Sequence, residues 1–189
     1  GTEHRGTFRG IVDKIPYLKE LGITTLELLP VVEFQEVMMP ENAEGNPYGS
    51  SEPTGRLNYW GYTKAGMFAP KASYADPGMS PVTEFKYMVR ELHRAGLEVV
   101  PELYFSGKEV PEFVLETVRF WVREYHVDGI HLTGYAPVDL LAKDPYLADT
   151  KLWAISWDAP KPSAGEKKHL GEYNDGFLID MRRALKGDE

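Results

Sequence analysis

The chain has 189 residues, of which 42% are hydrophobic and 26% charged, a composition that suits one domain with a hydrophobic core. Its net charge of -8 argues against nucleic acid or an anionic membrane surface as a partner, because both attract clustered Lys and Arg. No apolar run suits a membrane span, the polar start is not a signal peptide, and the absence of Cys excludes disulfides and fits a reducing compartment such as the cytoplasm.

The first part of the chain predicts a helix, a strand and a long loop. Apolar residues recur at helical spacing and end at a glycine stop signal: Ile11, Ile15, Leu18, Leu21 and Gly22. Residues 23–29 form a short apolar run before a proline and predict a buried strand. Residues 35–60 are rich in Pro, Gly, Asn and Ser and predict a loop of a length that is usually functional or disordered.

A second helix is predicted from Ser80, as its N-cap, and Pro81 in its first turn, to the stop signal Gly96. Its apolar face consists of Phe85, Met88, Val89 and Leu92. Residues 97–105 predict the next strand. Because Pro101 has no backbone N–H to donate, we expect this strand to be short, bulged or at a sheet edge at that point.

The remaining elements continue the alternation of strands and helices. They are a helix at 111–125, a strand at 128–132, a short helix at 139–147, a strand at 152–157, a polar loop at 159–172 and a helix at 177–186. This alternation predicts an α/β fold with parallel strands joined by right-handed crossovers. No repeat or linker divides residues 1–189, so we expect a single domain.

Several segments, in order along the chain, resemble the alpha-amylase superfamily (glycoside hydrolase family 13), in particular its isoamylase, pullulanase and glycogen-debranching branch. The most specific segment is Asn-Tyr-Trp-Gly-Tyr at 58–62, followed by Phe-Ala-Pro at 68–70. Further resembling segments lie at 5–24, 27–31, 84–100, 119–129 and 173–183. The resemblance implies a (β/α)8 TIM barrel with its site at the C-terminal strand ends. This chain is expected to hold approximately strands two to five, without the family's long insertion after the third strand.

Two further segments, 127–133 and 151–158, resemble the strands that carry the family's nucleophile and general acid. At the matching positions this chain has Thr133 and Ile155 in place of carboxylates. A retaining glycosidase needs one carboxylate to attack the sugar and another to protonate the leaving oxygen. Threonine substitutes poorly for the first, and isoleucine has no proton to donate. We therefore predict a pseudoenzyme with no catalytic residues at these positions.

The resemblance implies three substrate-binding positions, Tyr62, Glu102 and His131. Tyr62 matches a tyrosine that forms a stacking floor under the sugar in the resembling enzymes, and the alternative is an aromatic residue packed in the loop. Glu102 stands where the family has Asp at the end of its third strand. His131 stands where it has Arg, two residues before the nucleophile. No His or acidic cluster has metal-ligand spacing, so we expect neither a metal nor another cofactor.

Three functions remain open at this point. The first is a non-catalytic domain of carbohydrate metabolism that binds alpha-glucan or regulates a partner. The second is an active glycoside hydrolase or transglycosylase that uses displaced carboxylates, for which the candidates are Glu102, Asp128, Asp139, Asp149 and Asp158. The third is a structural remnant without sugar binding. Because four barrel strands leave two unpaired edges, we also expect self-association or packing against the missing half of the barrel.

Overall fold

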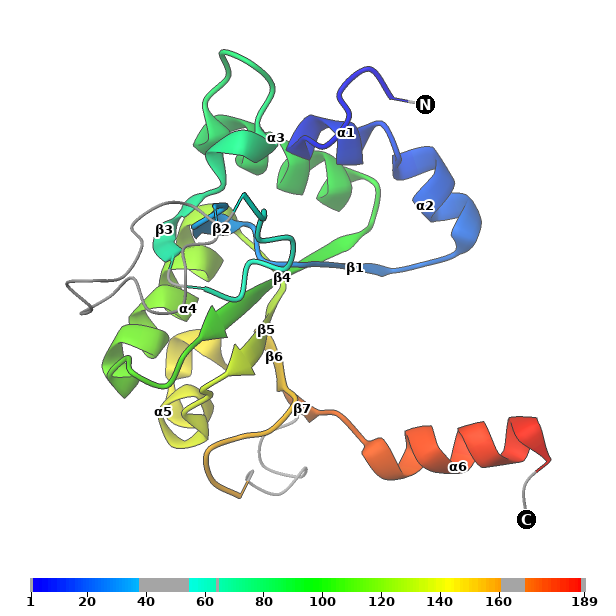
Figure 1. The fold of residues 1–189 in the computed structure, drawn as a ribbon, viewed down its shortest axis with the longest axis vertical. Coiled ribbons are helices and arrows are strands. Elements are labelled where there is room, and N and C mark those ends of the chain that lie inside the picture. Colours follow the sequence, from blue (N-terminus) through cyan, green and yellow to red (C-terminus); the bar gives the residue numbers. More distant parts are fainter. Residues whose placement is uncertain (1, 38–54, 64, 161–168, 188–189) are drawn as a thin grey trace.

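The computed structural model describes residues 2–37, 55–63, 65–160 and 169–187. Its centre is a five-stranded parallel sheet with the strand order β1-β4-β5-β6-β7 (Figure 1). These strands are β1 (Thr25–Leu28), β4 (Glu98–Phe105), β5 (Gly129–Gly134), β6 (Lys151–Ala154) and β7 (Leu170–Glu172). A separate antiparallel pair consists of β2 (Val32–Phe34) and β3 (Ala65–Pro70). The predicted α/β fold with parallel strands is confirmed.

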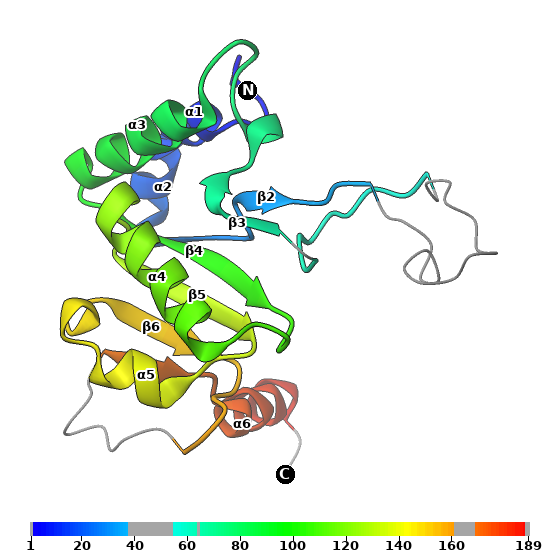
Figure 2. The same cartoon turned by 90° about the vertical axis from the view of Figure 1, so that its left-hand side faces the viewer.

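The helices alternate with the strands along the chain. The α-helices are α1 (Phe8–Val12), α2 (Ile15–Leu21), α3 (Pro81–Arg94), α4 (Pro111–Tyr125), α5 (Val138–Lys143) and α6 (Asp175–Lys186). Two 3-10 turns, η1 (Ala72–Tyr74) and η2 (Pro145–Leu147), complete the described elements. Helices α3, α4 and α5 lie on one side of the main sheet (Figure 2). Among the described helices, none has the length and apolar character needed to cross a bilayer.

The two faces of the sheet differ in chemistry. On one face, alternate residues of neighbouring strands join the helices in the hydrophobic core, among them Leu103, Phe105, Ile130 and Leu132. Because successive side chains of a strand point to opposite faces, the residues between these belong to the other face. That second face has mainly acidic, hydroxyl and aromatic side chains: Glu27, Glu102, Tyr104, His131, Thr133 and Trp153. The candidate site therefore lies on the face turned away from the helices.

Helix α3 agrees with its prediction at both ends. The Ser80 side chain accepts a hydrogen bond from the backbone N–H of Thr83, and Gly96 has a positive φ of 76° just after the helix. All four residues of the predicted apolar face are buried. Buried Glu84 adds a link that the apolar pattern does not reveal, because its carboxylate accepts the backbone N–H groups of Arg9 and Asp76 at 2.9 and 2.8 Å.

The expectation at Pro101 is wrong. Strand β4 has eight residues and lies in the sheet interior, between β1 and β5. Its residues Glu98–Pro101 pair with β1, whereas Glu102–Phe105 pair with β5. Pro101 is therefore the last residue of the ladder with β1, and the ladder with β5 begins at the next residue. The missing backbone N–H of Pro101 is accommodated where the pairing changes from one neighbour to the other.

The described residues correct several other expectations about strands. The strand predicted at 23–29 is the shorter β1, which lies at the sheet edge and is only partly buried. The strand predicted at 152–157 ends at Ala154. The loop predicted at 159–172 contains β7, which gives the sheet a fifth parallel strand, although residues 161–168 of that prediction lie outside the described residues.

The long loop predicted at 35–60 is only partly described, because 38–54 lie outside the described residues. Its flanks are more ordered than predicted. Val37 and Leu57 form an antiparallel bridge, and β2 and β3 pair just outside the predicted loop. The predicted short helix at 139–147 is divided into α5 and η2, because Pro145 begins a new turn capped by Asp144.

The last predicted helix is confirmed and begins two residues earlier, with the Asn174 side chain accepting the backbone N–H of Phe177 at 2.9 Å. None of its residues is buried. Several of its apolar side chains are exposed: Phe177, Leu178, Ile179, Met181 and Leu185. Figure 1 shows α6 extending away from the sheet. Its amphipathic pattern therefore has no covering surface among the described residues.

Candidate functional site

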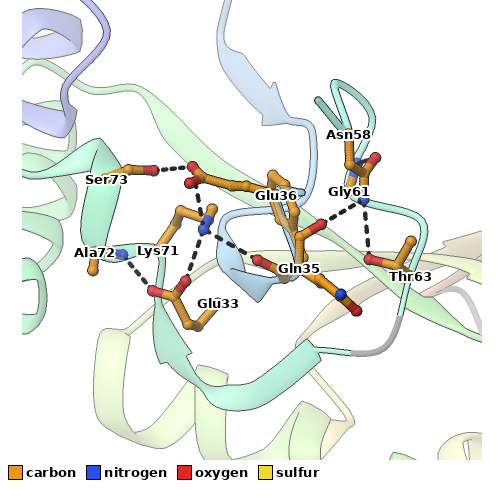
Figure 3. Close-up of polar contacts among 10 residues, drawn as sticks. Glu33, Gln35, Glu36, Asn58, Gly61, Thr63, Lys71, Ala72 and Ser73 are labelled. Carbon is orange, nitrogen blue, oxygen red and sulfur yellow. Dashed lines mark hydrogen bonds and ion pairs between the residues drawn. The ribbon is translucent and has the colours of Figure 1, made fainter. Parts of the chain in front are cut away.

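The chain around Tyr62 makes a tight turn in which Asn58, Gly61 and Thr63 contact one another (Figure 3). The Asn58 side chain accepts the backbone N–H of Gly61 and donates to the Thr63 hydroxyl, both at 3.0 Å. Asn58 thus holds this turn together. Gly61 has a φ of 79°, and a Cβ there would lie 2.8 Å from Cβ of Pro30. Only glycine fits this close approach, so the turn fixes the direction of the chain at Tyr62.

A buried lysine anchors the strand pair beside this turn (Figure 3). The Nζ of Lys71 lies 2.7 Å from Glu33, 3.3 Å from Glu36 and 3.1 Å from the backbone oxygen of Phe34. The hydrogen bond from Ser73 and the nearby Lys71 hold the pKa of Glu36 below its ordinary value, against the opposing effect of burial. These contacts pair the buried ammonium group of Lys71 with acidic and backbone oxygens. We therefore assign Lys71 a structural role.

The structure brings together the three residues predicted to bind substrate. Glu102 and His131 are register partners on β4 and β5, and both are buried. The Tyr62 hydroxyl lies near the Glu102 carboxylate, whose charge acts on it. The ring of Tyr62 also lies against Tyr104, with centroids 5.5 Å apart. Tyr62 is thus held at the polar face of the sheet, with 38% of its surface exposed.

Glu27 is a member of the cluster that the sequence analysis missed. Its Oε1 lies 2.6 Å from Nδ1 of His131, and Oε1 of Glu102 lies 4.0 Å from the same nitrogen. Ligand atoms of these three side chains all lie within 4.8 Å of one another. One signal was available: Glu27 is an acidic residue within an apolar run, between Leu26 and Leu28.

The imidazole of His131 is enclosed by two aromatic rings. The Trp153 ring lies nearly parallel to it at 6.0 Å between centroids, and the Tyr173 ring lies at 5.5 Å. Nε2 of His131 is buried and has no hydrogen-bond partner among the described residues. Trp157 is turned elsewhere, because its indole N–H donates to the backbone oxygen of Gly171 at 3.0 Å.

The two positions that the resemblance matched to the family's catalytic acids differ in their surroundings. Thr133 is the fifth residue of β5, and its hydroxyl donates a hydrogen bond to Glu102. Ile155 lies just beyond the end of β6 and is 57% exposed. Neither side chain can ionise. The acid–base capacity of this cluster therefore comes from Glu27, Glu102 and His131.

The other acids considered as displaced carboxylates lie outside this cluster. Asp128 accepts the backbone N–H of Val99 at 2.8 Å at the start of its strand, the end opposite to Thr133. Asp158 accepts the backbone N–H of Val138, the first residue of α5, at 2.8 Å. Asp139 forms an exposed pair with Lys143 at 3.3 Å. Of the carboxylates that the sequence suggested as replacements, only Glu102 belongs to the group of ligating side chains described here.

The carboxylates of the cluster raise the pKa of nearby phenols. Burial, then the hydrogen bond to Glu102 and the negative charges of Glu102 and Glu27, raise the pKa of Tyr62 to about 12. Burial, followed by the charges of Glu27 and Glu102, also raises the pKa of Tyr173. Each effect disfavours the phenolate, because burial and negative neighbours both oppose a second negative charge.

We expect alkaline pH to destabilise the chain through its buried phenols. Burial raises the pKa of Tyr125 from 10.0 to about 12, so its neutral form contributes stability that is complete below pH 10 and lost as the pH rises through about 12. Urea unfolding at a series of pH values should show this loss. The Tyr125→Phe variant should depend less on pH in that window, and an unchanged pH dependence would contradict the assignment.

Comparison with known proteins gives a consistent set of relatives, although no protein-family model matches the chain. It is 29% identical to the chloroplastic isoamylase 3 of Oryza sativa subsp. japonica over an alignment of 253 residues, which covers 97% of this chain and 32% of the relative. It is 30% identical to a glycogen debranching enzyme of Serratia proteamaculans, covering 97% of this chain and 36% of that enzyme. The chain thus spans about a third of the length of these relatives.

Solved structures agree on the fold. The crystal structure of pullulanase type I from Bacillus subtilis str. 168, complexed with maltose, superposes with a TM-score of 0.66 at 22% sequence identity, covering 94% of this chain and 33% of that one. The parallel sheet with its helices is therefore part of an α/β barrel of the amylase type. The curated relatives are isoamylases and glycogen debranching enzymes, and the chain belongs to this branch of the alpha-amylase superfamily.

Proposed function

We propose that this chain is a non-catalytic domain of the debranching branch that binds alpha-glucan. The observation that supports the proposal is the hydroxyl of Thr133, which donates to Glu102 at the position that the resemblance matches to the attacking carboxylate. Exposed Ile155, which the resemblance matches to the general acid, has no proton to give. The proposal includes that residues 1–189 form a single domain.

Exposed aromatic side chains beside the cluster favour a sugar ligand. Trp60 and Tyr62 lie nearly parallel, with ring centroids 6.5 Å apart, and Trp60 is 56% exposed. Flat aromatic faces offer apolar surface to the C–H groups of a pyranose ring, with polar groups at their edges. Names of relatives point to the same ligand class, since the chain resembles glycogen debranching enzymes and a pullulanase that was crystallised with maltose.

The proximity of Glu27 and Glu102 favours a second candidate, a glycosidase with displaced carboxylates. Their nearest oxygens lie within 4.8 Å, and retaining glycosidases have carboxyl groups roughly 5–5.5 Å apart. Two contacts argue against this candidate. The imidazole of His131 lies 2.6 Å from Glu27 and 4.0 Å from Glu102, and the Glu102 side chain is only 4% exposed. We therefore prefer the binding function.

Glucan binding is tested by titrating the chain with maltooligosaccharides and recording tryptophan fluorescence. We expect a saturable change, because Trp60 stacks on Tyr62 and Trp153 on His131. The Tyr62→Ala variant should bind at least about tenfold more weakly, a loss of roughly 1.4 kcal/mol. The control is Tyr146→Ala, which removes a comparably exposed tyrosine in η2.

A wild-type chain without any response would contradict the binding function and favour a structural remnant. Equal weakening in both variants would mean that Tyr62 has no specific part in the site. The Tyr62→Phe variant separates stacking from hydrogen bonding, because it keeps the ring and loses the hydroxyl near Glu102.

A further inference from the structure

Glu27, Glu102 and His131 come from three neighbouring strands, β1, β4 and β5. They form the one group of three metal-ligating side chains found among the described residues, with ligand atoms within 4.8 Å of one another. Glu102 and His131 are buried, whereas the Glu27 side chain is 41% exposed. Burial therefore holds the side chains of Glu102 and His131 in place, whereas the side chain of Glu27 has room to move.

The charge balance of this group favours a bound cation. Two carboxylates lie close together on a partly buried surface, where like charges repel more strongly than in water. Within the described residues, no lysine or arginine forms an ion pair with either carboxylate, and His131 is the sole ion-pair partner of both. A metal ion would supply the positive charge that these residues lack.

The ring of His131 is buried, with the residue as a whole only 5% exposed. Nδ1 is the ring nitrogen that faces the group, 2.6 Å from Oε1 of Glu27 and 4.0 Å from Oε1 of Glu102. Nε2 is buried and has no hydrogen-bond partner among the described residues, but it is not the nitrogen that these contacts direct at the carboxylates. Nδ1 is therefore the atom of His131 that an ion in the group would contact.

We propose that Glu27, Glu102 and His131 bind a divalent transition-metal ion, for which Zn²⁺ is the best-fitting probe. One imidazole nitrogen and two carboxylate oxygens suit zinc and its neighbours, whereas Ca²⁺ and Mg²⁺ prefer all-oxygen sites. Three protein ligands leave a fourth position for solvent. This inference does not depend on the proposed glucan binding.

The surroundings of Glu102 fit the role of a metal ligand. Thr133 donates a hydrogen bond to its carboxylate, and such outer contacts orient ligands in known metal sites. Nδ1 of His131 lies 2.6 Å from Glu27, which is a hydrogen-bond distance. Two ligand atoms on one zinc ion are roughly 3–3.5 Å apart, given zinc–ligand distances of about 2.0–2.2 Å. Half-exposed Glu27 has room to withdraw by that difference.

The test is calorimetric titration of the purified chain with ZnCl2 at neutral pH, with MgCl2 and CaCl2 in parallel. We expect one equivalent of Zn²⁺ to bind, and to bind at least tenfold more weakly to Glu27→Gln and Glu102→Gln. The matched control is His93→Gln, because His93 also pairs with a carboxylate, Asp128, at 2.8 Å on the surface. Since metal and proton compete for Nδ1, binding should weaken at acidic pH.

Three results would overturn the proposal: no Zn²⁺ binding to the wild-type chain, equal affinity in wild type and Glu27→Gln, or loss of binding in His93→Gln. A second readout guards against damaged variants. Zn²⁺ should raise the melting temperature of the wild type and of His93→Gln, and raise that of a folded Glu27→Gln by less at the same Zn²⁺ concentration.

Discussion

Replacement of Trp121 by Ala is expected to lower the free energy of unfolding by about 3–5 kcal/mol, the usual cost of truncating a large buried aromatic residue. Trp121 is fully buried, and its indole N–H donates to the backbone oxygen of Met67 at 2.7 Å. Its ring also lies 5.3 Å from that of Phe85 and 4.6 Å from that of Tyr125. One side chain thus joins α4 to β3 and α3.

Urea unfolding followed by circular dichroism measures this loss. The matched control is Trp60→Ala, whose tryptophan is 56% exposed and should change the stability by no more than about 0.5 kcal/mol. The Trp121→Phe variant keeps a ring and leaves the Met67 oxygen without its donor, so we expect a loss of roughly 1–3 kcal/mol from that effect. A loss below about 1 kcal/mol in Trp121→Ala would show that this contact does not hold the core together.

Helices were predictable from sequence because their signals are local. Ser80, Pro81 and Gly96 mark the ends of α3 through their own backbone preferences, and the structure bears out all three. The bounds predicted at 111–125 match α4 for the same reason. Each signal acts within a few residues, so it does not depend on how distant parts of the chain fold.

The strand predictions were wrong or incomplete where pairing with distant segments of the chain decides the structure. Pro101 was judged by its missing donor alone, whereas the two ladders of β4 use different halves of the strand. Strands β2 and β3 have three and six residues and pair across a long segment, so no local pattern identifies them. The short β7 was missed in the same way, because its place in the sheet depends on β6.

The candidate site was predicted only in part. The resemblance to the family singled out Tyr62, Glu102 and His131, and the structure brings these three together. Their role in substrate binding stays a prediction. Glu27 escaped notice because its importance arises from the register of three strands, which places it 2.6 Å from His131. Sequence spacing alone could not reveal a cluster whose members lie on separate strands.

The proposed loss of catalysis leads to the other large expected effect. General-acid help is worth roughly 10²- to 10⁴-fold in rate, and the nucleophile contributes further. With Thr133 and Ile155 at the two positions, little remains beyond substrate positioning. Glu27 and Glu102 are the acids that could replace them, and the contacts of His131 with both oppose that role.

Release of reducing sugar from glycogen and pullulan by the purified chain is the most direct test. We expect no release above the uncatalysed background, and the same result for Glu27→Gln and Glu102→Gln. The opposite outcome is equally definite. If the wild-type chain releases reducing sugar and either substitution abolishes that release, Glu27 and Glu102 are working catalytic acids and the domain is an enzyme.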